Sequence, residues 1–490
     1  MADRDEKHLL GRFWLAGQPE VTLPGWLDLS GPNPKITLAG QLTAPVEWRA
    51  TADGGVQGLP ASEFPDTRFT VHGRLSTGTR PNVTLLDADT YPQNFQVFGD
   101  LGAGSENGTQ VFEGYWLVRG AHLNPGESIL KAVVRFTYID EWAAHTGLTK
   151  YQDAKFEDGS PVELSYREPE PKEASIPGRP GSIRLTHKRE ITSPTVTGME
   201  IQHKAWLWID AQASTLDALY NDFVAPVLNL ASVMMDRSCK VTSLQVLVSG
   251  SEYYNRVHHP IVRDDHPVKP IKPGYSYLRL PDISLDNVAN AIASFSNIDP
   301  VPTILASSLG LDSGRFLETD LMELAACAEG IDRRMHKDDE TIFNQDTISE
   351  IQRIAANAVR CEIPGPLGDH AADQLVDKLR YFEPTYKERL LRLVEYIHES
   401  APAAAGVATE WAKSLVDARN NSAHLLPTSG TTWETKIALR DSLKWILGVA
   451  ILRYAGIDAG LIKRGLERHQ GYAFFIRKAR HHASNIYRNG

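Results

Sequence analysis

Cysteine is scarce in this sequence, and no two cysteines stand close together. The three are Cys239, Cys327 and Cys361. An odd, widely spaced set does not suit a disulfide framework and is typical of reduced thiols inside the cell. Three thiolates and a histidine such as His370 are a known zinc ligand set, but the short CxxC spacing of such sites is missing. We therefore predict no metal site.

The sequence also lacks a targeting segment and a long hydrophobic run. Its first eight residues, MADRDEKH, are charged, and no apolar core follows them. The most apolar run, Trp445 to Ile457, is too short to span a bilayer and contains Arg453. It is typical of a buried helix in a bundle. These absences predict a cytoplasmic protein that does not act on a membrane.

Motifs for nucleotide-driven or metal-dependent chemistry are missing as well. There is no glycine-rich phosphate loop and no HExxH pair, so we predict no cofactor. The formal net charge is −10. A protein that coats nucleic acid is usually basic, because binding depends on neutralising phosphates. Any contact with nucleic acid must therefore be local.

The pattern of the chain predicts an α+β multidomain protein whose β-rich part comes first. Residues 1–150 contain short runs rich in Val, Thr and aromatic residues, separated by Gly, Pro, Asn and Asp, which predicts an antiparallel β-sandwich-like domain. Most of its aromatic side chains are expected to fill the core, and a few could line a recognition groove. The predicted strands are Lys35–Leu42, Val46–Ala50, Arg68–Leu75, Asn94–Gly99, Gln110–Gly120 and Ala132–Ile139.

A proline-rich and charged stretch within 150–185 predicts a linker, and strand patterning then resumes. Residues 180–270 are predicted to form a second α/β lobe of the same half. In it a helix with apolar residues from Leu216 to Leu230, capped by Ser214 or Thr215, lies between strands. The three prolines of Pro267–Gly274 predict a second linker.

From residue 284 to residue 490 the apolar spacing is helical and the intervening loops are short. This pattern predicts an all-α up-and-down bundle. The expected helices include Asp286–Phe295, Thr409–Asn420 and Trp433–Ala455, with others beginning near Phe316, Ile348, Leu375 and Tyr386.

Arginine followed after four to six residues by histidine occurs four times in the bundle. The pairs are Arg392/His398, Arg419/His424, Arg464/His469 and Arg477/His482. Arg419/His424 is distinguished by its context, since a polar residue, Asn420, follows the arginine and Pro427 ends the helix. The guanidinium of Arg can donate two parallel hydrogen bonds to phosphate oxygens, and the imidazole of His can accept or release a proton near neutral pH. The pair therefore predicts chemistry on a phosphodiester.

The segment RNNSAH from Arg419 to His424 resembles the signature of HEPN domains, which are helical bundles that in many cases act as dimeric, metal-independent ribonucleases. The opening GRFWLAGQPE from Gly11, with GWL from Gly25 and ITLAG from Ile36, resembles the ApeA family of bacterial anti-phage defence proteins. That family joins an N-terminal β-rich domain to a C-terminal HEPN domain. The resemblance implies a homodimer, a phage-derived trigger and abortive infection, with cellular RNA, and tRNA as a guess, as the substrate.

In such an endoribonuclease His424 would be the general acid/base, Arg419 would clamp the phosphate, and Asn420 would orient the His or the ribose. One pair supplies a single proton-transfer group, so a two-fold dimer that brings two motifs together suits the reaction better. The products would carry a 2′,3′-cyclic phosphate and a 5′-hydroxyl.

Residues 461–490 form a basic tail with seven Lys or Arg against Glu467 alone, a formal +6. Aromatic residues are interleaved with these cations, as a surface that holds single-stranded RNA requires. The alternative is a cationic face packed on the acidic remainder of the chain. The residues predicted to bind RNA are Arg464, Arg468, Arg477, Lys478 and Arg480.

Two other functions are compatible with parts of the sequence. In one, the HEPN-like bundle only dimerises or binds RNA or nucleotide, and the β half senses a ligand. An intact Arg/His motif argues against it. In the other, the β half is a carbohydrate-active enzyme, which requires a pair of carboxylates. The acids of residues 1–150 are scattered, and no pair stands out.

Overall fold

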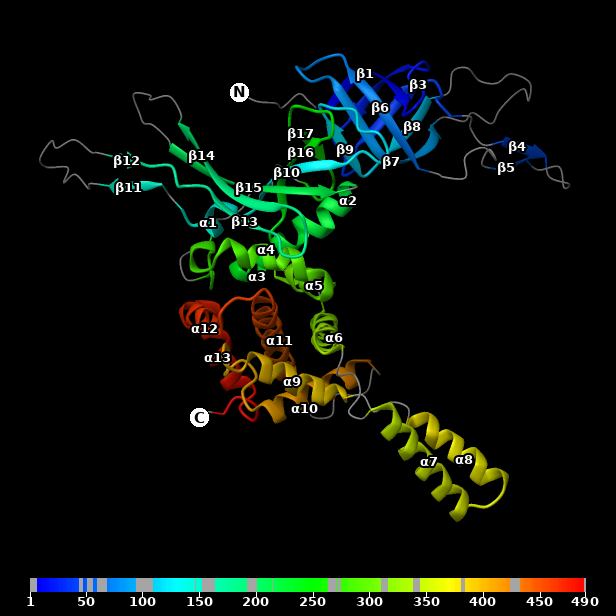
Figure 1. Ribbon diagram of the computed structural model, residues 1–490, viewed down its shortest axis with the longest axis vertical. Coiled ribbons are helices and arrows are strands. Elements are labelled where there is room, and N and C mark those ends of the chain that lie inside the picture. The colour runs from blue at the N-terminus through cyan, green and yellow to red at the C-terminus, as the bar shows by residue number, and fades with distance from the viewer. Residues whose placement is uncertain are drawn as a thin grey trace, which may run out of the picture. The chain divides into compact units, whose positions relative to one another are not determined.

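The computed structural model describes residues 7–43, 47–50, 56–59, 68–93, 109–145, 147–151, 164–191, 201–213, 215–262, 271, 275–309, 316–337, 344–379, 384–423 and 432–488. The chain separates into two compact units, and each is described by itself. The β unit comprises 1–228, 239–271 and 284–293, and the helical unit comprises 229–238, 272–283 and 294–490. The predicted α+β class, with antiparallel strands before helices, is confirmed (Figure 1).

In its described residues, the β unit contains one large antiparallel sheet of thirteen strands and two small two-stranded ribbons, β4–β5 and β11–β12. Most predicted strands are present within a few residues of their expected ends, but the predicted strand Gln110–Gly120 is divided into two, and Asn94–Gly99 lies outside the described residues. The strands are β1 His8–Leu15, β2 Leu23–Asp28, β3 Lys35–Ala39, β4 Glu47–Ala50, β5 Val56–Leu59, β6 Phe69–Leu75, β7 Asn82–Gln93, β8 Thr109–Glu113, β9 Trp116–Arg119, β10 Ile129–Phe136, β11 Leu148–Tyr151, β12 Leu164–Tyr166, β13 Lys172–Ser175, β14 Ser182–Ile191, β15 Ile201–Ala213, β16 Val241–Val248 and β17 Asn255–His258.

The first strands close into a six-stranded barrel rather than a pair of facing sheets. They pair in the order β7–β6–β1–β2–β3–β8, and β8 pairs again with β7. Closure removes the free edges that would otherwise be open to pairing with other chains. Alternating burial along β1 places Leu9, Phe13 and Leu15 inside. The barrel is therefore a packed core.

The Phe13 ring needs a glycine opposite it in the barrel. A Cβ added to Gly73 on β6 would lie 2.3 Å from Cδ1 of Phe13 and 2.9 Å from a methyl of Val83. Interiors are close-packed, so no neighbour could move far enough to admit it. Phe13 is fully buried, and its neighbour Trp14 points to the opposite side and packs on His122 with ring centroids 5.1 Å apart. The opening segment of the sequence is therefore a structural part of the barrel.

The rest of the large sheet joins strands from both predicted β regions. β10, near the end of the 1–150 region, pairs with β15 on one side and β16 on the other. Helix α4 (Leu285–Ser294) clusters with the β unit, while the helices that follow belong to the helical unit. The domain limits 1–150, 180–270 and 284–490 stay predictions.

A helix from Leu216 to Met235 follows β15 and is the one described helix that is long and apolar enough to cross a membrane. It consists of α2 (Leu216–Leu219), a π-helical turn (Tyr220–Val224) and α3 (Ala225–Met235). Of its most apolar window 67% is buried inside the protein, as in a core helix. Thr215 caps it as predicted, accepting a hydrogen bond from the Ala218 amide at 3.0 Å. The π turn ends at Val224, two residues before Pro226, whose ring disrupts regular α-helical bonding.

Most helices of the helical unit pack around a central one, α11. The predicted buried run is confirmed, because residues 446–452 of α11 are all buried. A helix that is apolar on every side belongs in a core. Around α11 pack α5, α6, α9, α10, α12 and α13. The helices are α5 Val301–Ser308, α6 Leu317–Met335, α7 Gln345–Glu362, α8 Pro366–Lys378, α9 Tyr386–Ile397, α10 Ala408–Ala423, α11 Trp433–Tyr454, α12 Ala459–Arg468 and α13 Gln470–His482.

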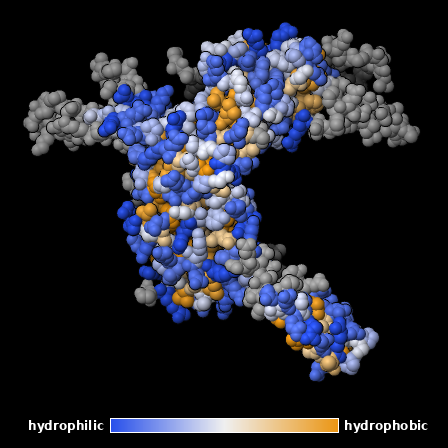
Figure 2. All heavy atoms as spheres, viewed as in Figure 1, coloured by the Kyte–Doolittle hydropathy of each residue, from blue (hydrophilic) through white to orange (hydrophobic). Residues whose placement is uncertain are grey.

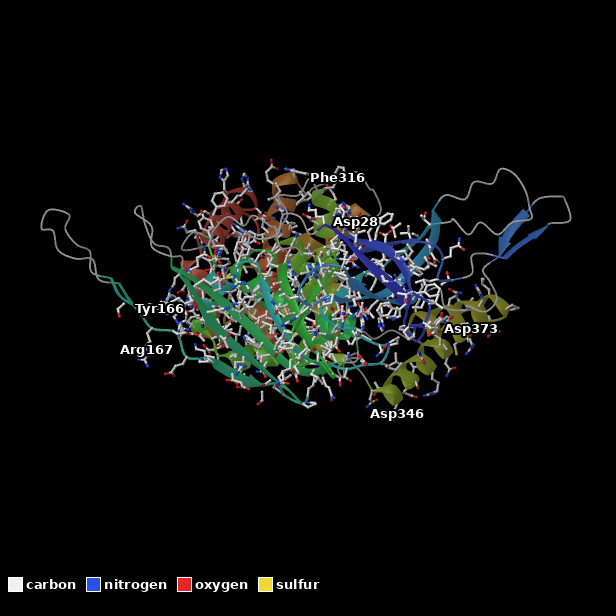
Figure 3. The ribbon with its side chains drawn as sticks, turned by 90° about the horizontal axis from the view of Figure 1, so that it is seen from above. Asp28, Tyr166, Arg167, Phe316, Asp346 and Asp373 are labelled. Carbon is white, nitrogen blue, oxygen red and sulfur yellow. The ribbon has the colours of Figure 1, made fainter. Side chains whose placement is uncertain are left out.

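Helices α7 and α8 pack on each other as an antiparallel hairpin. Its surface is mostly hydrophilic, with isolated hydrophobic side chains such as Ile354 and Leu367 exposed (Figure 2). Asp346 and Asp373 mark its two helices in Figure 3. Arg360 on α7 bridges to α8 by ion pairs with Asp369 and Asp373.

Candidate functional site

Arg419 lies on α10 and is held by a carboxylate of α6. Its Nη2 donates to Oε2 of Glu329 at 3.1 Å. The other oxygen of Glu329 accepts from Arg333 Nη2 at 3.2 Å, one turn further along α6. The carboxylate therefore joins an arginine of its own helix to Arg419. The Arg419 side chain is 32% exposed, so it is partly accessible to a ligand.

A tyrosine ring from α9 covers one face of the same guanidinium. Cζ of Arg419 lies 4.3 Å from the centroid of the Tyr386 ring, a cation–π contact. The Tyr386 hydroxyl donates to the Ala325 carbonyl on α6 at 3.2 Å, which fixes the ring. Burial raises the pKa of Tyr386 far above its usual value, although the Arg419 charge acts in the opposite direction. Tyr386 therefore stays a neutral hydrogen-bond donor at physiological pH.

The structure describes two of the three predicted catalytic residues. Asn420 follows Arg419 on α10 and is exposed, which leaves it accessible to a substrate. His424 lies outside the described residues, one position beyond the end of α10 at Ala423. How His424 is arranged with respect to Arg419 therefore stays a prediction from their spacing.

Two of the other Arg/His pairs contain a residue that serves the packing of the bundle. Arg392 Nη2 donates to Oδ2 of the buried Asp332 at 2.5 Å. His469 is buried and caps α13, its Nδ1 accepting from the Tyr472 amide at 3.1 Å. These contacts explain why the spacing of Arg and His alone is a poor guide to chemistry.

The five residues predicted to bind RNA lie on the last two helices. Arg464 and Arg468 are exposed on α12, and Arg477 and Arg480 are exposed on α13, where Lys478 is half-buried. Phe474 of α13 is 59% exposed. The last two helices thus expose both cations and an aromatic side chain, which are the two elements used to hold unstacked nucleotides.

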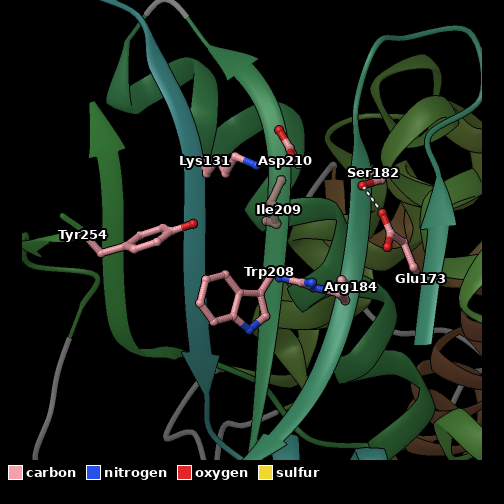
Figure 4. Close-up of a pocket in the computed structure, with 8 residues that line it drawn as sticks. All are labelled: Lys131, Glu173, Ser182, Arg184, Trp208, Ile209, Asp210 and Tyr254. Carbon is pink, nitrogen blue, oxygen red and sulfur yellow. Dashed lines mark hydrogen bonds and ion pairs between the residues drawn. The ribbon is translucent and has the colours of Figure 1, made fainter. Parts of the chain in front are cut away.

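The β unit has a shallow polar pocket on its large sheet (Figure 4). Trp208 and Tyr254 form its aromatic wall, with ring centroids 5.3 Å apart. Lys131 is paired with Asp210 at 2.5 Å, and Ser182 donates to Glu173 at 2.8 Å. The charges of Lys131 and Asp210 therefore neutralise each other within the pocket.

Three histidines gather elsewhere in the β unit. The His187 ring on β14 lies 4.7 Å from that of His203 on β15 and 5.6 Å from that of His145. Tyr166, labelled in Figure 3, packs edge-on against His203. Within the described residues no hydrogen-bond partner is found for either nitrogen of His187, and no group of three or more His, Cys, Asp or Glu is arranged to hold a metal ion.

We expect this cluster to make the β unit sensitive to acid. Burial, with the neighbouring His203, lowers the pKa of His187 to about 4. The unfolded chain takes up the proton near pH 6.5 and the folded chain near pH 4, so stability falls across that window. For His187 alone the loss is about 2 kcal/mol between pH 7 and pH 5.

Urea unfolding of His187→Phe at both pH values should show a correspondingly weaker pH dependence than wild type. The exposed His370 on α8 provides the control, since His370→Phe removes an imidazole without touching the cluster. An unchanged pH dependence in His187→Phe would contradict the expectation.

As a class, the protein joins an antiparallel β unit containing a closed barrel to a helical unit with an anchored, accessible arginine. The family model described as ApeA N-terminal domain 1 matches residues 8–289, more than half of the chain. The chain therefore belongs to the ApeA family, the anti-phage defence family that its opening resembles. No curated protein and no solved structure matches it. The family match ends before most of the helical unit, which includes α10.

Glu329 and Tyr386 are the functional candidates that the sequence did not reveal. Glu329 stands four residues before Arg333, which is the spacing of an ordinary surface ion pair on a helix. Tyr386 is the first residue of α9, directly after its capping residue Thr385. Only the packing of α6, α9 and α10 brings both side chains to Arg419.

Proposed function

We propose that the chain is a metal-independent endoribonuclease of the HEPN type that acts in bacterial anti-phage defence. The observation that carries this proposal is the way in which the Arg419 side chain is held in place. An ion pair and an aromatic ring hold its guanidinium, while the group remains partly exposed. A guanidinium that is fixed before substrate arrives can stabilise phosphate charge without reorganising during the reaction.

The proposed reaction is attack of a ribose 2′-hydroxyl on the adjacent phosphorus. The new O–P bond forms as the bond to the 5′-oxygen breaks, which gives a 2′,3′-cyclic phosphate and a 5′-hydroxyl. His424 moves the protons, Arg419 stabilises the non-bridging oxygens, and Asn420 orients the His or the ribose by hydrogen bonds. A homodimer that brings two motifs together would supply separate groups for the two proton transfers.

Membership in the ApeA family supports a defence role for this activity. We propose that the β unit responds to a phage-derived trigger and that the helical unit then cuts cellular RNA, with tRNA as the first candidate substrate. An unrestrained ribonuclease would harm its own cell, so a role for the β unit in regulation is physically reasonable.

The test compares RNA cleavage by the purified full-length protein with and without EDTA and then maps the ends of the products. We expect cyclic phosphate and 5′-hydroxyl ends, an unchanged rate in EDTA, and a loss of about 10²- to 10⁴-fold in His424→Ala. Loss of cleavage in EDTA, or products with 5′-phosphates, would refute the mechanism. RNA binding without cleavage would support a non-catalytic binding protein instead.

The basic surface of α13 gives a further prediction. Replacing both Arg477 and Arg480 by alanine should weaken RNA binding and flatten its salt dependence. Each phosphate contact contributes a slope of about −0.7 in a plot of log affinity against log salt for single strands, so the slope should fall by about 1.4. Fluorescence anisotropy with a labelled RNA at several salt concentrations measures it.

The control for this pair is the double variant Arg353→Ala and Arg360→Ala on α7. Both arginines are bound to acids, Arg353 to Glu350 and Arg360 to Asp369 and Asp373. The control removes the same formal charge and should leave the slope unchanged. Equal slopes for all three proteins would mean that α13 does not contact the phosphates.

A further inference from the structure

The carboxylate of Glu329 is itself fixed on both sides. Its Oε1 accepts from Nε and Nη2 of Arg333 at 3.3 and 3.2 Å, and its Oε2 accepts from Arg419. The side chain is 20% exposed, so it is shielded more than a typical surface acid. A carboxylate tied to its own helix through one oxygen presents the other in a defined direction. Arg419 therefore meets an oriented partner.

The second contact to Arg419 is anchored to the same helix. Tyr386 donates to the carbonyl of Ala325, which stands one turn before Glu329 on α6. Glu329 thus binds the guanidinium at one nitrogen, and Tyr386 covers a face. The two contacts together restrict the position of the group, because one binds a nitrogen and the other holds Cζ over the ring.

This arrangement leaves the Arg419 side chain 32% exposed to a ligand. A guanidinium has five N–H donors, and the contact with Glu329 uses Nη2. A guanidinium already held in place does not have to reorganise as charge develops on the phosphate in the transition state. Orientation of this kind acts on the rate of the chemical step more than on the affinity for the RNA.

We propose that Glu329 is a positioning residue that orients Arg419 toward the scissile phosphate, with Tyr386 as its support. The inference rests on the proposed ribonuclease function and goes beyond it by assigning a role to α6. The opposite role, in which Glu329 inhibits cleavage, has a physical basis as well. A carboxylate that competes with the phosphate for Arg419 would restrain cleavage, and its removal would then accelerate the reaction.

The experiment measures kcat and KM for RNA cleavage by full-length wild type, Glu329→Gln, Arg419→Ala and the double variant. Glutamine keeps the shape and an acceptor oxygen but removes the charge. We expect kcat to fall by about 10- to 100-fold in Glu329→Gln, with KM little changed. The double variant should be no slower than Arg419→Ala alone, because Glu329 acts through Arg419. Tyr386→Phe, which loses the anchoring hydroxyl, should give a smaller loss of kcat.

Glu350→Gln is the matched control, since Glu350 also binds an arginine of its own helix, Arg353. It should cleave at the wild-type rate. Thermal unfolding shows whether each variant is folded. If Glu329→Gln does not fold, kcat is compared between wild type and Tyr386→Phe instead.

Wild-type or faster cleavage by Glu329→Gln would overturn the positioning role while leaving the ribonuclease intact. The positioning role would also be overturned if Glu329→Gln lowered kcat by the same factor in the Arg419→Ala background as it does in the wild-type protein. If Arg419→Ala cleaves as fast as wild type, or wild type does not cleave, the proposed function itself fails and this inference fails with it.

Discussion

Replacing Arg419 by alanine is expected to lower the rate of RNA cleavage by about 10²- to 10³-fold, the usual effect of removing one preorganised donor from a charge-stabilising site. Arg419→Lys should recover little of this activity. A lysine ammonium cannot donate a planar pair of hydrogen bonds to two phosphate oxygens, and it would not reproduce the guanidinium contact with the Tyr386 ring. The measurement is the single-turnover cleavage rate at saturating RNA. Cells that express the variant should correspondingly lose protection against phage.

Arg453 on α11 provides a control of unusually similar surroundings. Its guanidinium lies 5.0 Å from the ring centroid of Tyr396, and its Nη1 lies 3.7 Å from Glu399. Arg453→Ala therefore removes an arginine with an aromatic and an acidic neighbour outside the motif. We expect it to cleave RNA normally. Equal rates in Arg419→Ala and wild type would show that the motif is not catalytic and would favour a binding role for the helical unit.

Local patterns in the sequence were sufficient for the class of the fold and for most of its elements. The apolar spacing identified α6 and α11, and the cap of the helix beginning at Leu216 was narrowed to Ser214 or Thr215, because capping depends on neighbouring residues only. Closure of the barrel was not predictable in this way. Closure requires β8 to pair with both β3 and β7, and β3 is far from both of these strands in the sequence.

The candidate site likewise contains residues that a local pattern predicted and residues that only the packing of the helices reveals. Arg419 and Asn420 could be proposed from a short motif, and the structure places both on α10. Glu329 and Tyr386 are 90 and 33 positions from Arg419 in the sequence, and nothing in their local pattern distinguishes them. Their role depends on which helices pack together, and that is decided by the buried faces of the whole helical unit.

The packing of those helices gives the last prediction, the effect of removing the carboxylate of Asp332 on α6. Its side chain is fully buried and lies 3.4 Å from Nη1 of Arg389 and 2.5 Å from Nη2 of Arg392, both on α9. Arg389 is itself 2% exposed. Asp332→Ala leaves a buried cation without its carboxylate, so we expect the free energy of unfolding to fall by about 3–5 kcal/mol.

Denaturant unfolding followed by helical circular dichroism measures this loss. Asp332→Ala combined with Arg389→Met should be more stable than Asp332→Ala alone, because no buried charge remains unpaired. The exposed Asp369 is the control, and Asp369→Ala should cost less than about 1 kcal/mol. A double variant no more stable than the single one would contradict the explanation. Asp332 stands three residues after Glu329, and α9 carries both Arg389 and Tyr386. The ion pairs that fasten α6 to α9 therefore also set the distance between the two side chains that hold Arg419, and Asp332→Ala should slow cleavage even where the protein remains folded.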